Sequence, residues 1–105
     1  MSKVKISIEE QDIEKAYNAL ELLAKDSDGE YNYSICARYC PIGQAYLRQF
    51  GSYIDVFKNY IKNLDTNETT DIPDDASRYA SSFDDYPITG NRVIPIDFEM
   101  EFPWL

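Results

Sequence analysis

The chain has 105 residues, a formal net charge of −9 and no histidine. This length fits a single domain, residues 1–105, which should bury roughly two-thirds of the surface that its unfolded chain exposes. A hydrophobic content of 44%, with nine tyrosines, predicts an ordered fold despite the charge. Histidine is the usual neutral-pH base and the commonest metal ligand, so we expect no enzyme, no metal site and no cofactor.

The sequence also bears on where the protein works. It contains no apolar run near the ~20 residues of a membrane span, and its N-terminus has no stretch of signal-peptide length. We therefore expect a cytoplasmic protein that does not bind membranes. Cys36 and Cys40 are too few for a disulfide framework, and free thiols are the default in a reducing compartment.

The first third of the chain predicts a strand and a helix. Val4, Ile6 and Ile8 alternate with polar residues, which is typical of a half-buried strand. Ser7 and Glu10 have capping-box spacing, and a helix should follow. Its apolar positions, at helical spacing, are Ile13, Ala16, Tyr17, Leu20, Leu23 and Ala24. The next stretch, residues 30–40, is compatible with a short strand or an ordered loop.

The middle of the chain predicts a second helix and a second strand. Pro41 suits the first turn of a helix and Gly51 suits its C-terminal cap, so we expect a helix from Pro41 to Phe50. Residues 52–61 are rich in β-branched and aromatic side chains and read as one strand, followed by a loop.

The last third predicts a helix that begins after Pro73 and ends near Asp84, with an apolar stripe at Ala76, Tyr79, Ala80 and Phe83. A final strand should turn Ile94, Ile96, Phe98, Met100 and Phe102 to one face and acids to the other. The predicted fold class is α+β, with about three strands in a small antiparallel or mixed sheet and three helices packed on one face.

One candidate site is the start of the helix at Pro41. Amides of a first turn have no intrahelical acceptor and the helix dipole favours an anion, so a phosphate or carboxylate would fit there. The residues of this candidate anion site are Arg38, Cys40, Ile42, Gly43 and Gln44. The alternative interpretation is structural, in which Pro41 simply starts a helix whose small residues allow close packing.

The other candidate site is acidic. Residues 65–105 hold ten Asp or Glu against two Arg, a local balance of −8. Direct nucleic-acid binding is therefore not expected, whereas a basic partner is. Carboxylates spaced by two along a strand lie about 6.5–7 Å apart, close to the phosphate spacing of a nucleic-acid strand. The expected partner-binding residues are Asp71, Asp74, Asp75, Tyr79, Asp84, Asp85, Tyr86, Asp97, Glu99 and Glu101. Alternatively, these charges only keep the surface soluble and protect a strand edge.

Three motifs carry a family likeness: residues 40–46 (CPIGQAY), Phe83-Asp84 at a helix end, and residues 93–98 (VIPIDF). Together they resemble a diffuse group of small phage and prophage proteins with a Cys-Pro-(Ile/Val) helix start and a late Pro-x-x-Phe strand. The likeness covers residues from about 4 to 100. It implies a phage origin and a shared fold, and this group has no settled activity.

Two functional hypotheses follow. The first is a non-enzymatic inhibitor, acting in the cytoplasm of a bacterial host, that binds a basic host protein or nucleoprotein complex through its carboxylates. The target would handle nucleic acid or serve in defence, as a CRISPR-like complex does. The second is a protein that binds or sequesters a nucleotide or signal molecule, with the anion at Arg38 and a base on Tyr33, Tyr39 or Tyr46. An uncovered edge strand and an aromatic tail in which Phe102 and Trp104 need burial are also compatible with a homodimer.

Overall fold

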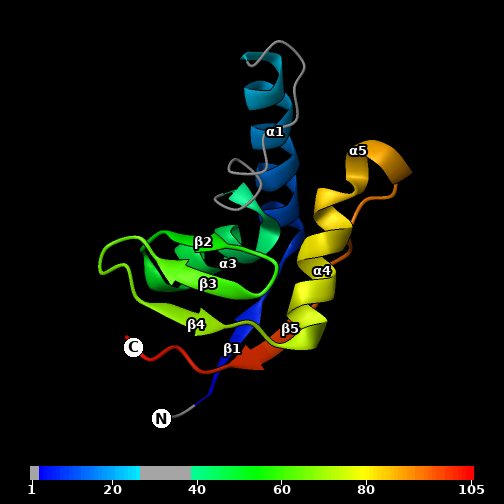
Figure 1. Cartoon of the computed structure of the whole chain (residues 1–105). Coiled ribbons are helices and arrows are strands. Elements are labelled where there is room, and N and C mark those ends of the chain that lie inside the picture. The colour runs from blue at the N-terminus through cyan, green and yellow to red at the C-terminus, as the bar shows by residue number, and fades with distance from the viewer. Residues whose placement is uncertain (1–2, 27–38) are drawn as a thin grey trace.

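The computed structural model describes residues 3–26 and 39–105 (Figure 1). It begins with strand β1 (Val4–Ser7) and helix α1 (Glu10–Asp26), as the sequence predicts. The buried side of α1 includes Ile13, Ala16, Tyr17 and Leu20. The expected cap is wrong: Ser7 belongs to β1, and the N–H of Glu9 donates to Asp12 Oδ2 at 2.9 Å. One bond of a capping box therefore forms two residues later, between Glu9 and Asp12, because Ser7 is still paired in the sheet.

An ion pair between a buried carboxylate on α1 and a partly exposed guanidinium joins α1 to helix α3 (Pro41–Phe50). Asp12, whose side chain is 1% exposed, accepts from Arg48 Nε at 3.1 Å and from Arg48 Nη2 at 3.0 Å. The same Nη2 donates to the carbonyl of Ser7 at 2.6 Å, and Nη1 lies 3.3 Å from Glu9 Oε2. The guanidinium thus ties together the end of β1, the start of α1 and the C-terminal turn of α3.

Helix α3 (Pro41–Phe50) has the predicted bounds, and Gly51 ends it in the left-handed conformation at φ 78°. Next to Arg48, the Gln49 side chain covers one edge of β1. Its Oε1 accepts from the Ser7 N–H at 2.9 Å and its Nε2 donates to the Lys5 carbonyl at 3.0 Å. The amide replaces a neighbouring strand, which protects this edge from pairing with another chain.

The segment after α3 differs from the prediction of one strand and a loop. It forms a meander of β2 (Ile54–Val56), β3 (Tyr60–Asn63) and β4 (Thr69–Asp71), each antiparallel to the next. The run of β-formers is broken at residues 57–59, where the Phe57 N–H donates to the Tyr60 carbonyl at 2.9 Å and closes a turn. Composition favours strand throughout this stretch, and no glycine or proline marks the turn.

The C-terminal third contains α4 (Asp74–Asp84), the single turn α5 (Tyr86–Thr89) and β5 (Asp97–Met100). The predicted stripe on α4 is buried. The last strand is shorter than expected, and Ile94 is 68% exposed instead of inward, because the chain joins β1 only from the Ile8 N–H to Ile96 carbonyl bond onward. Phe98, Met100 and Phe102 face the core, as predicted.

The fold class is α+β, as predicted, but the strands form two sheets instead of one: β1–β5 and β2–β3–β4, all antiparallel. The Thr70 hydroxyl donates to the Glu101 carbonyl at 3.4 Å, so the two sheets lie side by side at this point. Helix α1 rises from the strand layer, α3 packs against β1 and β2, and α4 stands beside the β2–β3 turn (Figure 1).

The chain buries its own C-terminal aromatic residues. Phe102 is 3% exposed, and Trp104 is half-buried with its ring 5.5 Å from that of Phe102. The Trp104 indole N–H donates to the Tyr46 hydroxyl at 2.9 Å. The expectation that these side chains need a second copy for burial is therefore wrong, and a homodimer stays a prediction without that support.

Candidate functional site

A stacked pair of aromatic rings lies at the turn between β2 and β3. The ring centroids of Phe57 and Tyr60 are 4.7 Å apart, with an interplanar angle of 26°. Phe57 is half-buried, whereas Tyr60 is 39% exposed. Tyrosine is one of the residue types that most often contribute the largest share of the binding energy in protein interfaces. The sequence did not indicate this pair, because residues 52–61 were predicted to form one continuous strand.

The turn that carries these rings is bonded to the acidic part of the chain. The Ser77 hydroxyl on α4 donates to the Lys58 carbonyl at 2.6 Å, and the Ile72 N–H donates to the Asn59 carbonyl at 3.4 Å. These bonds place the turn against the connection from β4 to α4, where the predicted partner-binding residues 71–75 lie.

Three expected acids lie in the two segments that are bonded to this turn. Asp71 is directly opposite Tyr60 in the β3–β4 register, so both side chains lie on the same face of the sheet, with Cβ atoms about 4.5–5.5 Å apart. Asp74 and Asp75 are exposed in the first turn of α4, where the helix dipole favours negative charge. We call Phe57, Tyr60, Asp71, Asp74 and Asp75 the aromatic-acidic corner.

The predicted carboxylate row on the last strand is partly neutralised. Asp97, Glu99 and Glu101 are exposed, as expected from the alternation. However, Lys5 lies opposite Glu99 in the β1–β5 register, and its Nζ is 3.4 Å from Asp97 Oδ2. Since two of the three carboxylates face this lysine, the row is less negative than the sequence of β5 alone indicates.

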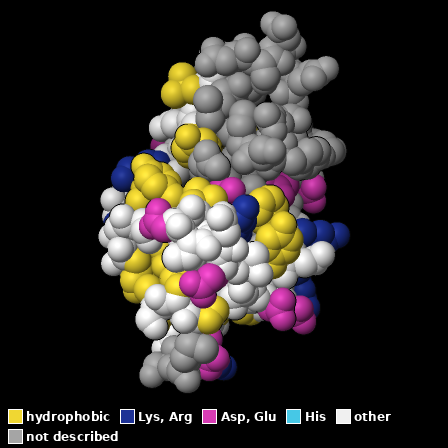
Figure 2. Space-filling model, turned by 60° about the vertical axis from the view of Figure 1, so that its left-hand side comes forward, with side chains coloured by type: hydrophobic (Ala, Val, Ile, Leu, Met, Phe, Trp, Pro, Cys, Tyr) yellow, Lys and Arg dark blue, Asp and Glu magenta, His cyan; other side chains and the backbone are white. Residues whose placement is uncertain are grey.

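The remaining acids lie elsewhere. Asp85 is exposed and Asp84 half-buried at the far end of α4 from the corner, as the predicted helix from Pro73 to Asp84 implies. In the face shown in Figure 2, acidic side chains form separate patches among hydrophobic and uncharged ones, not a continuous band. The acids among the expected partner-binding residues therefore fall into three groups: the corner, the β5 row and the end of α4.

Neither of the two predicted tyrosine anchors is fully exposed. Tyr79 is 8% exposed, and its hydroxyl donates to the Ile94 carbonyl at 2.8 Å. Burial raises its pKa well above the usual value for tyrosine. Tyr86 is half-buried, with its ring 4.6 Å from that of Tyr17. The prediction of a surface anchor at Tyr79 is wrong, because the α4 stripe that holds it faces the core.

The start of α3 is closed, contrary to the expectation of an open anion site. Cys40, Ile42 and Gly43 are buried and Gln44 is half-buried. The Gly43 N–H donates to Cys40 Sγ at 3.5 Å, and the Gln44 N–H donates to the Cys40 carbonyl. The alternative, structural interpretation fits these residues. Arg38, Tyr33 and Cys36 lie outside the described residues.

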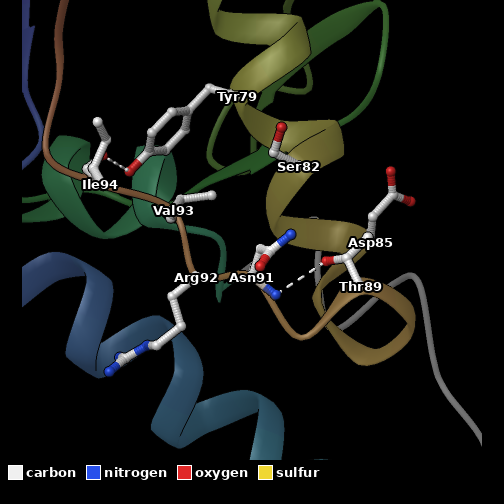
Figure 3. A pocket seen from close by; sticks show the side chains of 8 residues that line it. All are labelled: Tyr79, Ser82, Asp85, Thr89, Asn91, Arg92, Val93 and Ile94. Carbon is white, nitrogen blue, oxygen red and sulfur yellow. Dashed lines mark hydrogen bonds between the residues drawn. The ribbon is translucent and has the colours of Figure 1, made fainter.

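A cleft of about 350 Å³ lies between α4, α5 and residues 91–94 (Figure 3). Its lining includes two expected partner-binding residues, Tyr79 and Asp85. The side chain of Arg92 points away from it toward α1 (Figure 3), where its guanidinium lies 4.5 Å from the centre of the Tyr17 ring and 3.6 Å from Glu14 Oε1.

The polar groups of this cleft are largely engaged with the protein itself. The Ser82 hydroxyl donates to the Arg78 carbonyl at 3.0 Å, and the Thr89 hydroxyl oxygen accepts from the Asn91 N–H at 3.2 Å. The Tyr79 hydroxyl is bonded to the Ile94 carbonyl. Asp85 is the one carboxylate among the lining residues. The cleft has polar walls but no arranged pair of acid and base.

Comparison with known proteins gives no family: no family model, no curated protein and no solved structure matches this chain. Within residues 3–26 and 39–105, no cluster of three or more Cys, Asp or Glu side chains could hold a metal ion. In the same part of the chain, no helix combines the length and apolar character that a membrane crossing requires. The surface of the described residues is therefore the basis on which a function can be proposed.

Proposed function

We propose that this protein is a non-enzymatic acidic inhibitor of phage type, which binds a basic host protein or nucleoprotein complex in the bacterial cytoplasm. The observation that carries the proposal is the aromatic-acidic corner, where the exposed ring of Tyr60 lies opposite Asp71 and its turn is bonded to α4, which begins with the exposed Asp74 and Asp75. An interface needs a desolvated anchor as well as charge, and Tyr60 with Phe57 supplies that anchor.

The charge of the protein supports a basic partner. A net charge of −9 on 105 residues repels phosphate backbones and attracts surfaces rich in Lys and Arg. Much of the machinery that handles nucleic acid, including defence complexes, binds it through such surfaces. A protein that covers a basic channel with carboxylates competes with the nucleic acid for the same groups.

The β5 row has a supporting role in this proposal. Asp97, Glu99 and Glu101 are exposed and spaced by two, at roughly the interval of backbone phosphates. Lys5 lowers their net charge, so we assign the main contribution to the corner and a steering contribution to the row.

The test compares two triple variants with the same net charge. The first is Asp71→Asn, Asp74→Asn and Asp75→Asn in the corner; the control is Glu10→Gln, Glu14→Gln and Glu21→Gln on exposed positions of α1. Each tagged protein is used to capture complexes from a bacterial lysate, with elution in steps of increasing salt. Captured complexes are then assayed for nucleic-acid binding with and without added protein.

The expected result is a nucleic-acid-binding complex that the wild type and the α1 control retain and inhibit, and that the corner variant releases at much lower salt. If all three proteins retain the same complexes to the same salt concentration, total charge and not the corner governs binding, and the proposal fails. The small-ligand hypothesis receives no support from the closed start of α3.

A further inference from the structure

The aromatic-acidic corner has a geometry that distinguishes between the two basic side chains. It presents the Phe57–Tyr60 stack, with 39% of Tyr60 exposed, on the same sheet face as Asp71. A ring face carries negative electrostatic potential, and the carboxylate supplies two acceptor oxygens next to it. A planar cation with several N–H groups can therefore stack on the ring and bond to the carboxylate together.

Arginine fits this description and lysine does not. The guanidinium is flat, weakly hydrated and able to form paired hydrogen bonds with a carboxylate while it lies over an aromatic ring. The lysine ammonium is a compact, strongly hydrated charge that gains little from stacking. Attraction to the total charge of the protein is common to both, whereas an aromatic ring beside a carboxylate favours the guanidinium.

The protein already contains one arrangement of this kind. The guanidinium of Arg92 lies 4.5 Å from the centre of the Tyr17 ring, and Nη2 is 3.6 Å from the Glu14 carboxylate. Tyr60 and Asp71 repeat the ring and the carboxylate at the surface. Among the described residues, no arginine lies over Tyr60.

The neighbouring lysines leave this site negative. Lys62 is on the same sheet face and lies opposite Asp55 in the β2–β3 register. Lys58 is exposed in the turn itself, and its single positive charge is outnumbered by the negative charges of Asp71, Asp74 and Asp75. The local charge therefore complements a cation.

We propose that the aromatic-acidic corner binds an arginine side chain of a basic partner protein, with the guanidinium stacked on the Phe57–Tyr60 pair and bonded to Asp71. This inference rests on the proposed function and adds to it the kind of residue that the partner presents. The partner segment is identified by its arginine content and not merely by its positive charge.

The experiment measures binding of an all-arginine and an all-lysine peptide of equal length by calorimetry, over a series of salt concentrations. The wild type is expected to bind the arginine peptide about threefold to tenfold more tightly, the size of an exposed to partly desolvated cation–π contact. Tyr60→Leu should abolish this preference while it leaves the salt-dependent binding of the lysine peptide unchanged.

Matched controls come from the same sheet. Tyr53→Leu removes an exposed tyrosine at the start of β2, and Asp65→Asn removes a charge in the β3–β4 turn. Both should keep the arginine preference, whereas Asp71→Asn should reduce it. Lys58→Gln should strengthen binding of both peptides. Circular dichroism and thermal unfolding of each variant confirm that the fold is intact.

Three outcomes decide the matter. A preference that disappears in Tyr60→Leu, falls in Asp71→Asn and persists in the two controls supports the inference. Equal binding of both peptides by the wild type, or a preference that survives Tyr60→Leu, overturns the arginine site and leaves the proposed acidic function standing. No binding of either peptide at low salt overturns both.

Discussion

The buried carboxylate of Asp12 offers the sharpest test of how this fold is held together. Asp12→Asn changes little in size, but it replaces one acceptor oxygen by an NH₂ group. Three donors converge on the carboxylate: Arg48 Nε at 3.1 Å, Arg48 Nη2 at 3.0 Å and the Glu9 N–H at 2.9 Å. In the variant, at least one donor faces another donor and the guanidinium loses its main countercharge.

The expected loss follows from these contacts. Removal of one partner from a buried ion pair costs about 3–5 kcal/mol. The Arg48 side chain is 28% exposed and keeps its contacts with Glu9 and Ser7, so we expect the lower end, about 3 kcal/mol. For a domain of this size, such a loss lowers Tm by roughly 10–20 °C.

The assay is urea unfolding followed by the fluorescence of Trp104, the single tryptophan, with circular dichroism as a second probe. Glu14→Gln is the control, because it breaks an ion pair whose side chains are 54% and 45% exposed, and it should cost less than about 0.5 kcal/mol. Arg48→Met, alone and with Asp12→Asn, completes a double-mutant cycle.

A loss of less than about 1 kcal/mol in Asp12→Asn, or a coupling energy near zero in the cycle, would refute this reasoning. Either result would mean that the network at the junction of β1, α1 and α3 contributes little beyond its packing.

Three further predictions concern the core, a cap and alkaline pH. Phe83→Ala, at a fully buried position, should lower the free energy of unfolding by about 3–5 kcal/mol, measured by urea unfolding. Gly51→Ala should cost about 1–2 kcal/mol through strain alone, because φ is 78° and no atom lies within 4 Å of the added Cβ; Ser52→Ala is its control. Burial raises the pKa of Tyr79, so the unfolded state releases this proton first, and stability should fall as pH rises above about 10. Tyr79→Phe should flatten that fall in thermal unfolding across pH, and an unchanged slope would count against the assignment.

Much of the local structure could be predicted from the sequence, because local chemistry dictates it. Pro41 and Gly51 fix both ends of α3, and the period of apolar residues fixes α1 and α4. The sequence could not show that residues 57–59 turn back, since aromatic and β-branched side chains favour strand on both sides of the turn. It therefore missed the Phe57–Tyr60 stack on which the candidate site depends.

The charge of the chain can be predicted from the sequence, whereas the grouping of the charged residues cannot. Composition and periodicity are enough to predict the α+β class, the net charge of −9, the absence of histidine and the acid-out alternation of Asp97 and Glu99. Which acids lie close together depends on how the strands pair. Pairing placed Lys5 beside the β5 row and set Asp71 opposite Tyr60, because strand register joins residues that are distant in the chain.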